Sequence, residues 1–291
     1  DVLTARGLWS QYLEVGIGPD AEVFTKSQPM AAVGIGAEIG IHPKSTWNNP
    51  EPEVVLAIAP SGAIVGACLG NDVNLRDFEG RSALLLGKAK DNRASCAVGP
   101  FIRLFDDGFN LDHVRGMQVG LSVSGDDGFE LQGQSSIAEI SRDLADLAAY
   151  ACGPHNQYPD GLLLFTGTMF APTEDRDAPG QGFTHHLGDV VTISNPLLGS
   201  LSNQINHKDK IAPWTFGIGA LMRNLAARFV VSRLAERFGD QELNLRGAFL
   251  KTTNPWRSIF SGGIAGWGKT TKSMIGDILQ EIEGHIQRLN D

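Results

Sequence analysis

The chain has 291 residues, of which 42% are hydrophobic and 20% are charged, so it is long enough to fold around a substantial apolar core. Its formal net charge of -9 argues against a nucleic-acid or anionic-membrane partner, and its three widely spaced cysteines indicate neither a disulfide framework nor a zinc site. Because no apolar run reaches the roughly 18 residues of a membrane span and the start DVLTARGLWS lacks a signal-peptide pattern, we expect a cytoplasmic protein without a membrane partner, although the missing initial Met leaves open whether residues precede Asp1.

Most of the chain reads as short β-strands. Residues 22–36 and 53–69 are strand-like, and the second region divides into two strands at the turn PSG. Residues 117–136 predict a β-hairpin, because alternating residues flank the turn GDDG on both sides. The segment 135–151 predicts an amphipathic helix that starts at serine and stops at Cys-Gly. Strand-like sequence then returns in DGLLLFTGTMFAP and LGDVVTISNPLLGSLSNQI, so we expect a mainly β fold with few helices up to about residue 205.

The pattern becomes helical from about residue 217, since apolar residues recur three and four positions apart in residues 217–239 and 272–289. Between these segments the spacing G-x-x-x-x-G-K-[ST] of a phosphate-binding loop occurs at Gly263, Gly268, Lys269 and Thr270. Only 21 residues follow Thr270, too few for the parallel sheet and the magnesium-binding aspartate of a nucleotide hydrolase. We therefore expect no ATP binding at this motif.

Two glutamates stand at the start of a buried strand-like run, in the stretch NNPEPEVVLAIA. Residues two apart in a strand point to the same face, so Glu51 and Glu53 would lie side by side with Pro52 turned away. Two like charges at this distance repel, so the pair indicates either a cation between them or a proton on one of them. The alternative is a strand end at which both carboxylates face water.

A third acid, Asp72, follows the next strand-like run, AIVGACL. If the two runs pair as a hairpin across PSG, Asp72 returns to the neighbourhood of the glutamates. Three converging carboxylates are the hard oxygen ligands expected for Mg²⁺, Mn²⁺ or Ca²⁺, whereas scattered surface acids are the alternative. Lys88 and Lys90 come next, on a segment read as extended. A lysine beside such acids is either a salt-bridge partner or a group that orients an anion or moves a proton.

Five short motifs, in this order, resemble those of the fumarylacetoacetate hydrolase superfamily over roughly residues 20–220. They are F-x-K at Phe24–Lys26, PEPE ending in Glu51 and Glu53, GNDVNLRD with Asp72, K-x-x-x-x-S-C-x-x-G-P at Lys90–Pro100, and TGT at Thr166–Thr168. The form TWNNPEPE followed by GNDVNLRDFEG is most similar to the branch that acts on sugar acids. The resemblance implies an α+β fold that is mainly β, a mixed β-roll with a few peripheral helices, assembled as a homodimer or larger homo-oligomer.

The resemblance also implies a site and an activity. The matching motifs imply that Glu51, Glu53 and Asp72 are magnesium ligands and that Lys90 is the catalytic lysine, and they place Lys26 and Thr168 near the substrate. The implied enzyme is a metal-dependent lyase that dehydrates a 2-keto-3-deoxy sugar acid such as 2-keto-3-deoxy-D-arabinonate. A 2-keto acid can chelate Mg²⁺ through a carboxylate oxygen and the keto oxygen, so the metal stabilises an enolate as C3 loses a proton.

Two other functions stay open. A hydrolase of the same superfamily would cleave a C–C bond in an acylpyruvate or diketo acid, with a His and a Glu ahead of the F-x-K motif that activate water. This chain has no histidine ahead of Phe24, and His42 with Glu38 is a weak substitute because both follow that motif. The second alternative is an inactive metal-binding fold remnant that uses its helical tail for assembly.

Two further features complete the expectations. His185 and His186 are neighbours on an expected strand, where they would point in opposite directions, so a loop or surface role is favoured over catalysis. The resemblance fades near Arg228. We therefore expect a catalytic domain at residues 1–228 and a helical tail of unknown role at residues 229–291.

Overall fold

The computed structural model describes residues 2–238, with side chains to residue 228. Contacts between residues divide the chain into two units, Asp1–Gly217 and Ile218–Asp291. In the second unit the described residues form the helix α7 (Ile218–Phe238). Residue 228, the expected end of the catalytic domain, lies within this helix. The motif at residues 263–270 and the helix expected at residues 272–289 lie outside the described residues. Within the described part of the chain, no helix is both long enough and apolar enough to cross a membrane.

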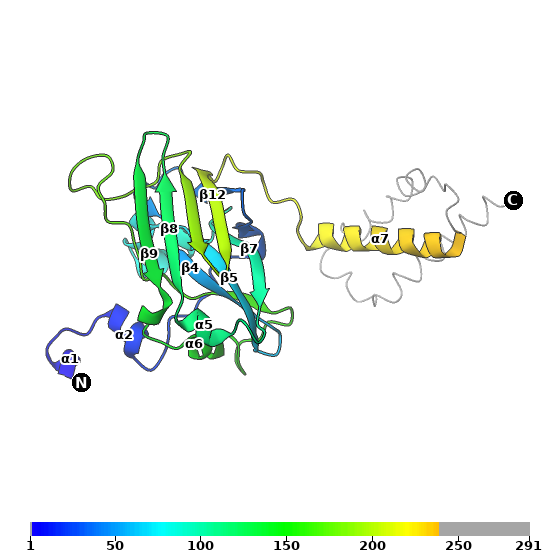
Figure 1. The fold of residues 1–291 in the computed structure, drawn as a ribbon, viewed down its shortest axis with the longest axis horizontal. Coiled ribbons are helices and arrows are strands. Elements are labelled where there is room, and N and C mark those ends of the chain that lie inside the picture. Colours follow the sequence, from blue (N-terminus) through cyan, green and yellow to red (C-terminus); the bar gives the residue numbers. More distant parts are fainter. Residues whose placement is uncertain (1, 239–291) are drawn as a thin grey trace. The chain divides into compact units, whose positions relative to one another are not determined.

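Two five-stranded sheets form the first unit (Figure 1). The first sheet has the order β1 (Ala32–Val33), β7 (Cys96–Leu104), β5 (Ile64–Asp72), β4 (Pro52–Ile58) and β10 (Leu162–Phe165). The second has the order β2 (Glu38–Ile41), β12 (Gly199–His207), β11 (Val190–Asn195), β8 (Gln118–Ser124) and β9 (Glu130–Ser136). Because β1 pairs with β7 and β2 with β12 in parallel while the other pairs are antiparallel, both sheets are mixed.

The two sheets share one apolar core. Strand β8 alternates strictly, with Val119, Leu121 and Val123 buried and the residues between them partly exposed. These side chains belong to the same core as Leu56 and Ile58 of β4, a strand that is buried along its whole length. The continuous apolar run of β4 therefore lies inside the molecule, whereas the alternating strands of the second sheet have one face in the core and one outside.

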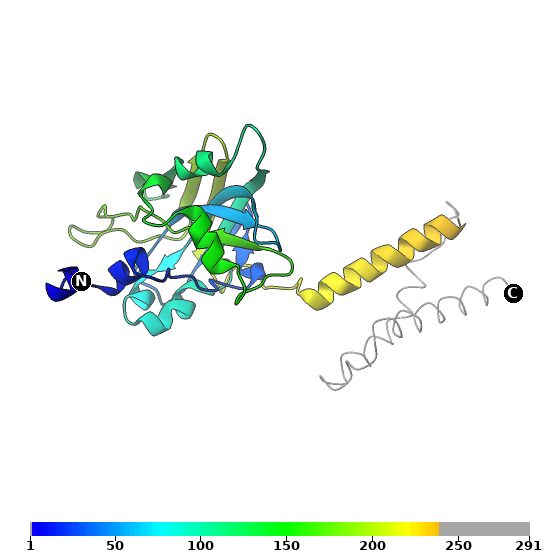
Figure 2. The same ribbon diagram turned by 90° about the horizontal axis from the view of Figure 1, so that it is seen from below.

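The helices of the first unit are short and peripheral. They are α1 (Val2–Ala5), α2 (Gln11–Ile17), α3 (Arg76–Glu79), α4 (Leu86–Lys90), α5 (Leu111–Arg115) and α6 (Leu144–Ala151), with 3₁₀ turns at Pro29–Ala31, Ala83–Leu85 and Ile137–Glu139. In Figure 1, α5 and α6 lie at the lower end of the sheets, and Figure 2 views the molecule from that end. The fold is thus α+β and mainly β, a mixed β-roll with peripheral helices, as predicted.

The strands around the acidic residues follow the sequence prediction closely. Strands β4 and β5 pair antiparallel on either side of the PSG turn, with Glu53 opposite Gly70 and Pro52 opposite Asn71. The hairpin expected at residues 117–136 is formed by β8 and β9. A small third sheet, β3 (Asn48–Asn49) with β6 (Asn74–Leu75), was not expected.

Three local predictions were wrong. Residues 22–36 contain only the two-residue strand β1, because Pro29 starts a 3₁₀ turn and the chain before it has no regular structure. The helix expected at residues 135–151 is preceded by the end of β9 and begins at Leu144, where Asp143 caps it by accepting a hydrogen bond from Ala145 N. The segment with Lys88 and Lys90 is the helix α4 and not an extended chain.

Candidate metal centre

The three predicted carboxylates converge at one end of the β4–β5 hairpin. Glu51 immediately precedes β4, and its carbonyl oxygen accepts a hydrogen bond from the backbone N–H of Asp72, the last residue of β5, at 3.1 Å. One carboxylate oxygen from each of Glu51, Glu53 and Asp72 lies within 4.8 Å of the other two. Glu53 and Asp72 are only 2% and 6% exposed. The alternative prediction, in which the glutamates face water at the end of a strand, is therefore wrong.

Burial and mutual repulsion make the carboxylates poor anions on their own. Burial raises the pKa of Glu53 well above its ordinary value, and the negative charges of Asp72 and Glu51 raise it further. Burial also raises the pKa of Glu51, although the ammonium group of Lys90 partly opposes this effect. The cluster therefore favours a positive charge between its members, which a cation or a proton can provide.

Two lysines supply part of that charge. Lys90, at the end of α4, places Nζ 2.6 Å from Glu51 Oε2 and 3.1 Å from Asp72 Oδ2. Lys26 Nζ lies 2.5 Å from Asp72 Oδ1 and donates a hydrogen bond to the carbonyl oxygen of Lys90 at 3.3 Å. Burial tends to lower the pKa of Lys90, but the charges of Asp72 and Glu51 outweigh it and the net shift is upward.

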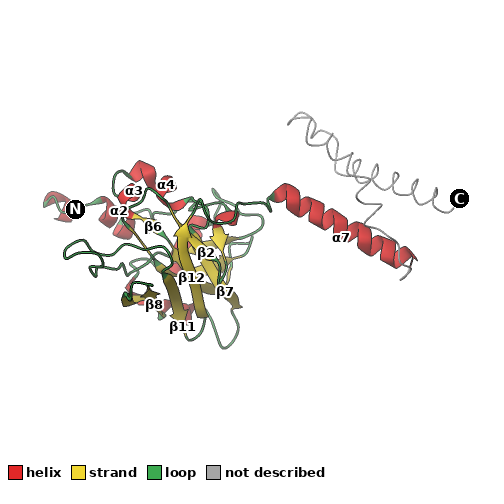
Figure 3. Cartoon of the chain, turned by 90° about the horizontal axis from the view of Figure 1, so that it is seen from above, coloured by secondary structure: helices red, strands yellow, loops and turns green. Residues whose placement is uncertain are grey.

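Lys88 has a different environment from Lys90. Residues two apart in a helix point to nearly opposite sides, so α4 separates these two lysines rather than putting them on one face. Lys88 is exposed, and its Nζ lies 5.7 Å from the centre of the Phe78 ring, in the geometry of a cation–π contact. Figure 3 shows α3 and α4 next to β6, the strand that follows Asp72.

Further contacts hold the acidic residues in place. Asn74 Nδ2 donates a hydrogen bond to Glu51 Oε1 at 2.9 Å, and the backbone N–H of Gly167 donates one to Glu53 Oε2 at 2.8 Å. Thr168 is half-buried, and its hydroxyl lies 3.0 Å from the carbonyl oxygens of Pro52 and Phe170. Neither Asn74 nor Gly167 was predicted from the sequence as part of the site. The signal for Asn74 was its position two residues after Asp72 in an extended segment, and the signal for Gly167 was the TGT motif.

The cluster fits a divalent cation in charge and in size. Oxygen ligands lie about 2.0 to 2.6 Å from Mg²⁺ or Ca²⁺, so two ligands on opposite sides of an ion are about 4 to 5 Å apart. The 4.8 Å limit among the oxygens of Glu51, Glu53 and Asp72 agrees with this span. Three carboxylates against two lysines also leave net negative charge for a cation.

The histidines considered from the sequence make their contacts elsewhere. His42 packs edge-on against Phe78 with ring centres 5.0 Å apart, while Glu38 accepts a hydrogen bond from Asn206. His185 and His186 lie on a loop and not on a strand. The loop role was therefore correct, but only His186 reaches the surface, because His185 is buried.

His185 belongs to a buried ionic network. Its Nδ1 lies 3.3 Å from Asp189 Oδ2, and Arg176 binds both carboxylate oxygens of Asp189 at 2.5 and 2.7 Å. His186 lies near two other acids, with Nδ1 3.3 Å from Asp127 and Nε2 3.0 Å from Asp177. Both histidines thus have structural partners.

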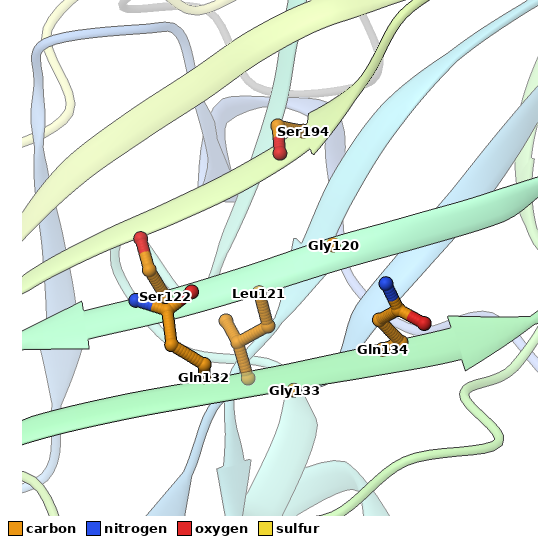
Figure 4. Close-up of a pocket in the computed structure, with 7 residues that line it drawn as sticks. All are labelled: Gly120, Leu121, Ser122, Gln132, Gly133, Gln134 and Ser194. Atoms are coloured by element: carbon orange, nitrogen blue, oxygen red, sulfur yellow. The ribbon is translucent and has the colours of Figure 1, made fainter.

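A surface hollow of about 480 Å³ lies on the outer face of the second sheet (Figure 4). Its lining is Gly120, Leu121, Ser122, Gln132, Gly133, Gln134 and Ser194. None of these side chains ionises near neutral pH, so the hollow lacks the acid, base or metal ligands that the carboxylate cluster offers.

Comparison with known proteins points to one family. Residues 17–206 match the family model described as fumarylacetoacetate (FAA) hydrolase C-terminal. A probable 2-keto-3-deoxyxylonate dehydratase of Haloferax volcanii is 30% identical over 194 residues, which are 67% of this chain and 63% of that protein. The 2-dehydro-3-deoxy-D-arabinonate dehydratase of Saccharolobus solfataricus is 28% identical over 190 residues, 65% of this chain and 60% of that protein. The chain thus spans less than two thirds of the length of both relatives.

Solved structures agree with this grouping. The apo form of 2-keto-3-deoxy-D-arabinonate dehydratase is similar with a TM-score of 0.60 and 27% identity, over 68% of this chain and 66% of that one. The same enzyme complexed with magnesium and 2,5-dioxopentanoate gives the same values. The family predicted from the motifs is therefore confirmed, and the similar proteins are named as dehydratases of sugar acids, as the motifs predicted. The chain belongs to the fumarylacetoacetate hydrolase family.

Proposed function

We propose that this protein is a divalent-metal-dependent dehydratase that removes water from a 2-keto-3-deoxy sugar acid. The observation that carries the proposal is the buried convergence of Glu51, Glu53 and Asp72, with two lysines in direct contact. The two relatives are named as dehydratases of such acids, and a similar structure is titled as a complex with magnesium and 2,5-dioxopentanoate. The substrate of this protein would be a five-carbon 2-keto-3-deoxy sugar acid, such as 2-keto-3-deoxy-D-arabinonate.

The three carboxylates would hold the cation. Mg²⁺ is the first choice and Mn²⁺ or Ca²⁺ the alternatives, because all three prefer carboxylate oxygen. A bound divalent ion would attract the carboxylate and keto oxygens of the substrate and stabilise the negative charge that develops when C3 loses a proton. Gly167 fixes one oxygen of Glu53 through its backbone N–H, so that carboxylate is orientated before any ligand binds.

Lys90 is the proposed proton-transfer residue. In its charged form, the ammonium group would protonate the departing C4 hydroxyl or bind the substrate carboxylate; in its neutral form, it would accept the C3 proton. A divalent ion beside it favours the neutral form, whereas Asp72 and Glu51 favour the charged form. The buried position of Lys90, with 4% of its surface exposed, suits either role because it limits competition from water.

Lys26 and Thr168 would contact the substrate. The ammonium group of Lys26 is bonded to Asp72 and adds positive charge beside the carboxylates, where an anionic substrate needs it. The hydroxyl of Thr168 donates to a backbone carbonyl and accepts from the N–H of Phe170, so its second lone pair would accept from a sugar hydroxyl of the substrate.

The assembly of the protein and the role of residues 229–291 are separate proposals. We propose a homodimer or larger homo-oligomer, which light scattering of the purified chain would measure. We also propose that residues 229–291 are dispensable for metal binding, because every residue placed in the cluster lies before them. Truncation after Arg228 should then leave the Mg²⁺ affinity unchanged.

Product identity tests the proposed reaction. The purified chain is incubated with Mg²⁺ and, in separate reactions, with 2-keto-3-deoxy-D-arabinonate, with its enantiomer 2-keto-3-deoxy-L-arabinonate and with an acylpyruvate. The dehydratase proposal predicts a product lighter by one water from at least one sugar acid and no cleavage of the acylpyruvate. Release of pyruvate from the acylpyruvate would instead indicate a hydrolase, and Mg²⁺ binding without any turnover would indicate an inactive fold.

A further inference from the structure

Asn74 lies beside the carboxylate cluster because of its place in the chain. It follows Asp72 by two residues in an extended segment, so both side chains point to the same side while Val73 between them is buried in the apolar core. Strand β6 begins at Asn74 and pairs with β3, where Asn74 stands opposite Asn49. Backbone pairing on one side and core packing on the other therefore fix the position from which the Asn74 side chain extends.

The two oxygens of the Glu51 carboxylate have different partners. Asn74 Nδ2 donates to Oε1 at 2.9 Å, and Lys90 Nζ lies 2.6 Å from Oε2. The backbone of Glu51 is held independently, since its N–H donates to Asn71 Oδ1 at 3.2 Å. The bond from Asn74 therefore controls the rotation of the carboxylate group rather than the path of the chain.

Asn74 is 6% exposed, and within the described residues its Oδ1 is buried without a hydrogen-bond partner. A buried polar group with an unused acceptor destabilises a fold, so an apolar side chain would be the more stable choice at this position. The bond to Glu51 is the contact that accounts for an amide there.

We propose that Asn74 is a positioning residue of the metal centre, which keeps the Glu51 carboxylate turned so that Oε2 stays beside Lys90 Nζ, the atom that also contacts Asp72. This inference rests on the proposed metal-binding role of Glu51, Glu53 and Asp72. Hydrogen bonds that orient a ligating carboxylate usually change metal affinity by about 10- to 100-fold when they are removed.

The chain offers a control with the same pair of residue types in the second sheet. Asn206 Nδ2 donates to Glu38 Oε1 at 2.7 Å, an asparagine–glutamate bond of the same chemistry on β12 and β2. Asn74→Leu and Asn206→Leu each remove one such bond and keep the number and branching of the side-chain heavy atoms. Calorimetric titration of the full chain with Mg²⁺ alone measures the affinity of both variants and of the wild type.

We expect Asn74→Leu to weaken Mg²⁺ binding by about 10- to 100-fold and Asn206→Leu to leave it unchanged. Thermal unfolding in EDTA reports the purely structural effect of each change. A lower midpoint for Asn74→Leu together with wild-type Mg²⁺ affinity would overturn the proposal, because the residue would then only support the fold. If Asn74→Leu does not fold, Asn74→Ala gives the same test with a smaller side chain. Wild-type protein that binds no Mg²⁺ would overturn the metal centre itself, a result distinct from equal affinities in wild type and variant.

Discussion

Lys90 Nζ lies 2.6 Å from Oε2 of Glu51, although 39 residues separate the two in the sequence. Glu51 is also a proposed metal ligand, so the ammonium group and a divalent cation are drawn to the same carboxylate. The two cations repel each other, and binding of the metal should therefore weaken the hold of Glu51 on Lys90. This coupling would direct the lysine toward substrate when the metal is bound.

Replacement of Lys90 separates catalysis from metal binding. We expect Lys90→Met to retain Mg²⁺ binding, because none of the three carboxylates is changed. Turnover should fall by about 10² to 10⁴, the usual effect of removing a positioned proton-transfer group. Steady-state kinetics at saturating Mg²⁺ and calorimetric titration with Mg²⁺ measure the two quantities.

Lys88 provides the control for this replacement. It lies on the same helix, is exposed and faces Phe78, so Lys88→Met should keep turnover near the wild-type value. Loss of dehydration in Lys88→Met with normal activity in Lys90→Met would show that the wrong lysine has been assigned.

We predict that Glu53 lowers the stability of the metal-free protein and that it is needed for Mg²⁺ binding. It is buried beside Asp72 and Glu51, and both neighbours carry the same charge. We expect Glu53→Gln to raise the thermal midpoint in EDTA, because a neutral amide avoids both the cost of burying a charged carboxylate and its repulsion by Asp72 and Glu51. The same change should weaken Mg²⁺ binding by at least about 100-fold, since even residues that only support a ligand cost about 10- to 100-fold.

The exposed Glu130 on β9 is the comparison residue for this experiment. Glu130→Gln should alter neither the thermal midpoint in EDTA nor the affinity for Mg²⁺. Glu53 is not a ligand if Glu53→Gln binds Mg²⁺ as tightly as Glu130→Gln does.

The buried His185 predicts a loss of stability in mild acid. Burial lowers its pKa below the ordinary value of 6.5, an effect that Asp189 only partly offsets and that the nearby Arg176 increases. The unfolded chain therefore takes up a proton at a higher pH than the folded chain does. This contribution to stability is fully present above about pH 6.5 and is lost as the pH falls from there toward the folded pKa.

Urea unfolding at a series of pH values between about 7.5 and 5 measures this effect. The free energy of unfolding of the wild type should decrease over this range, and His185→Leu should decrease less. His155 is exposed on a surface loop, so His155→Leu should follow the wild type. Equal pH dependence of wild type and His185→Leu would mean that His185 titrates normally in the folded protein.

The core of the acidic site could be predicted because its geometry is local. Residues two apart in a strand face the same side, which puts Glu51 beside Glu53, and the short PSG turn brings Asp72 back to them. Strand spacing and hairpin pairing together were therefore sufficient to predict the cluster. The assignment of Lys90 needed the resemblance to a family. Residue spacing alone treated Lys88 and Lys90 as equivalent, because the five-residue helix α4 is too short to give a periodic signal.

The contacts that the sequence analysis missed depend on pairings between distant segments. Gly167 reaches Glu53 because β10 pairs with β4, and Asn74 is fixed by a two-residue strand that has no recognisable pattern. The burial of His185 depends on the ion pair between Arg176 and Asp189. Arg176 lies in an irregular loop, and Asp189 lies at the end of that loop, just before β11. Side chains of this kind are placed by tertiary contacts, which periodicity does not reveal.

Exchange of the C3 protons tests most directly whether this centre activates a 2-keto acid for water loss. The full chain is incubated with 2-keto-3-deoxy-D-arabinonate in D₂O, with Mg²⁺ or with EDTA, and the C3 proton signals and the product are followed by NMR. We predict that with Mg²⁺ the C3 protons are lost at least as fast as the dehydrated product forms, and that EDTA or Glu53→Gln abolishes both processes. Dehydration that continues in EDTA, or the absence of C3 exchange and of product while Mg²⁺ is bound, would contradict the proposed role of the carboxylate cluster.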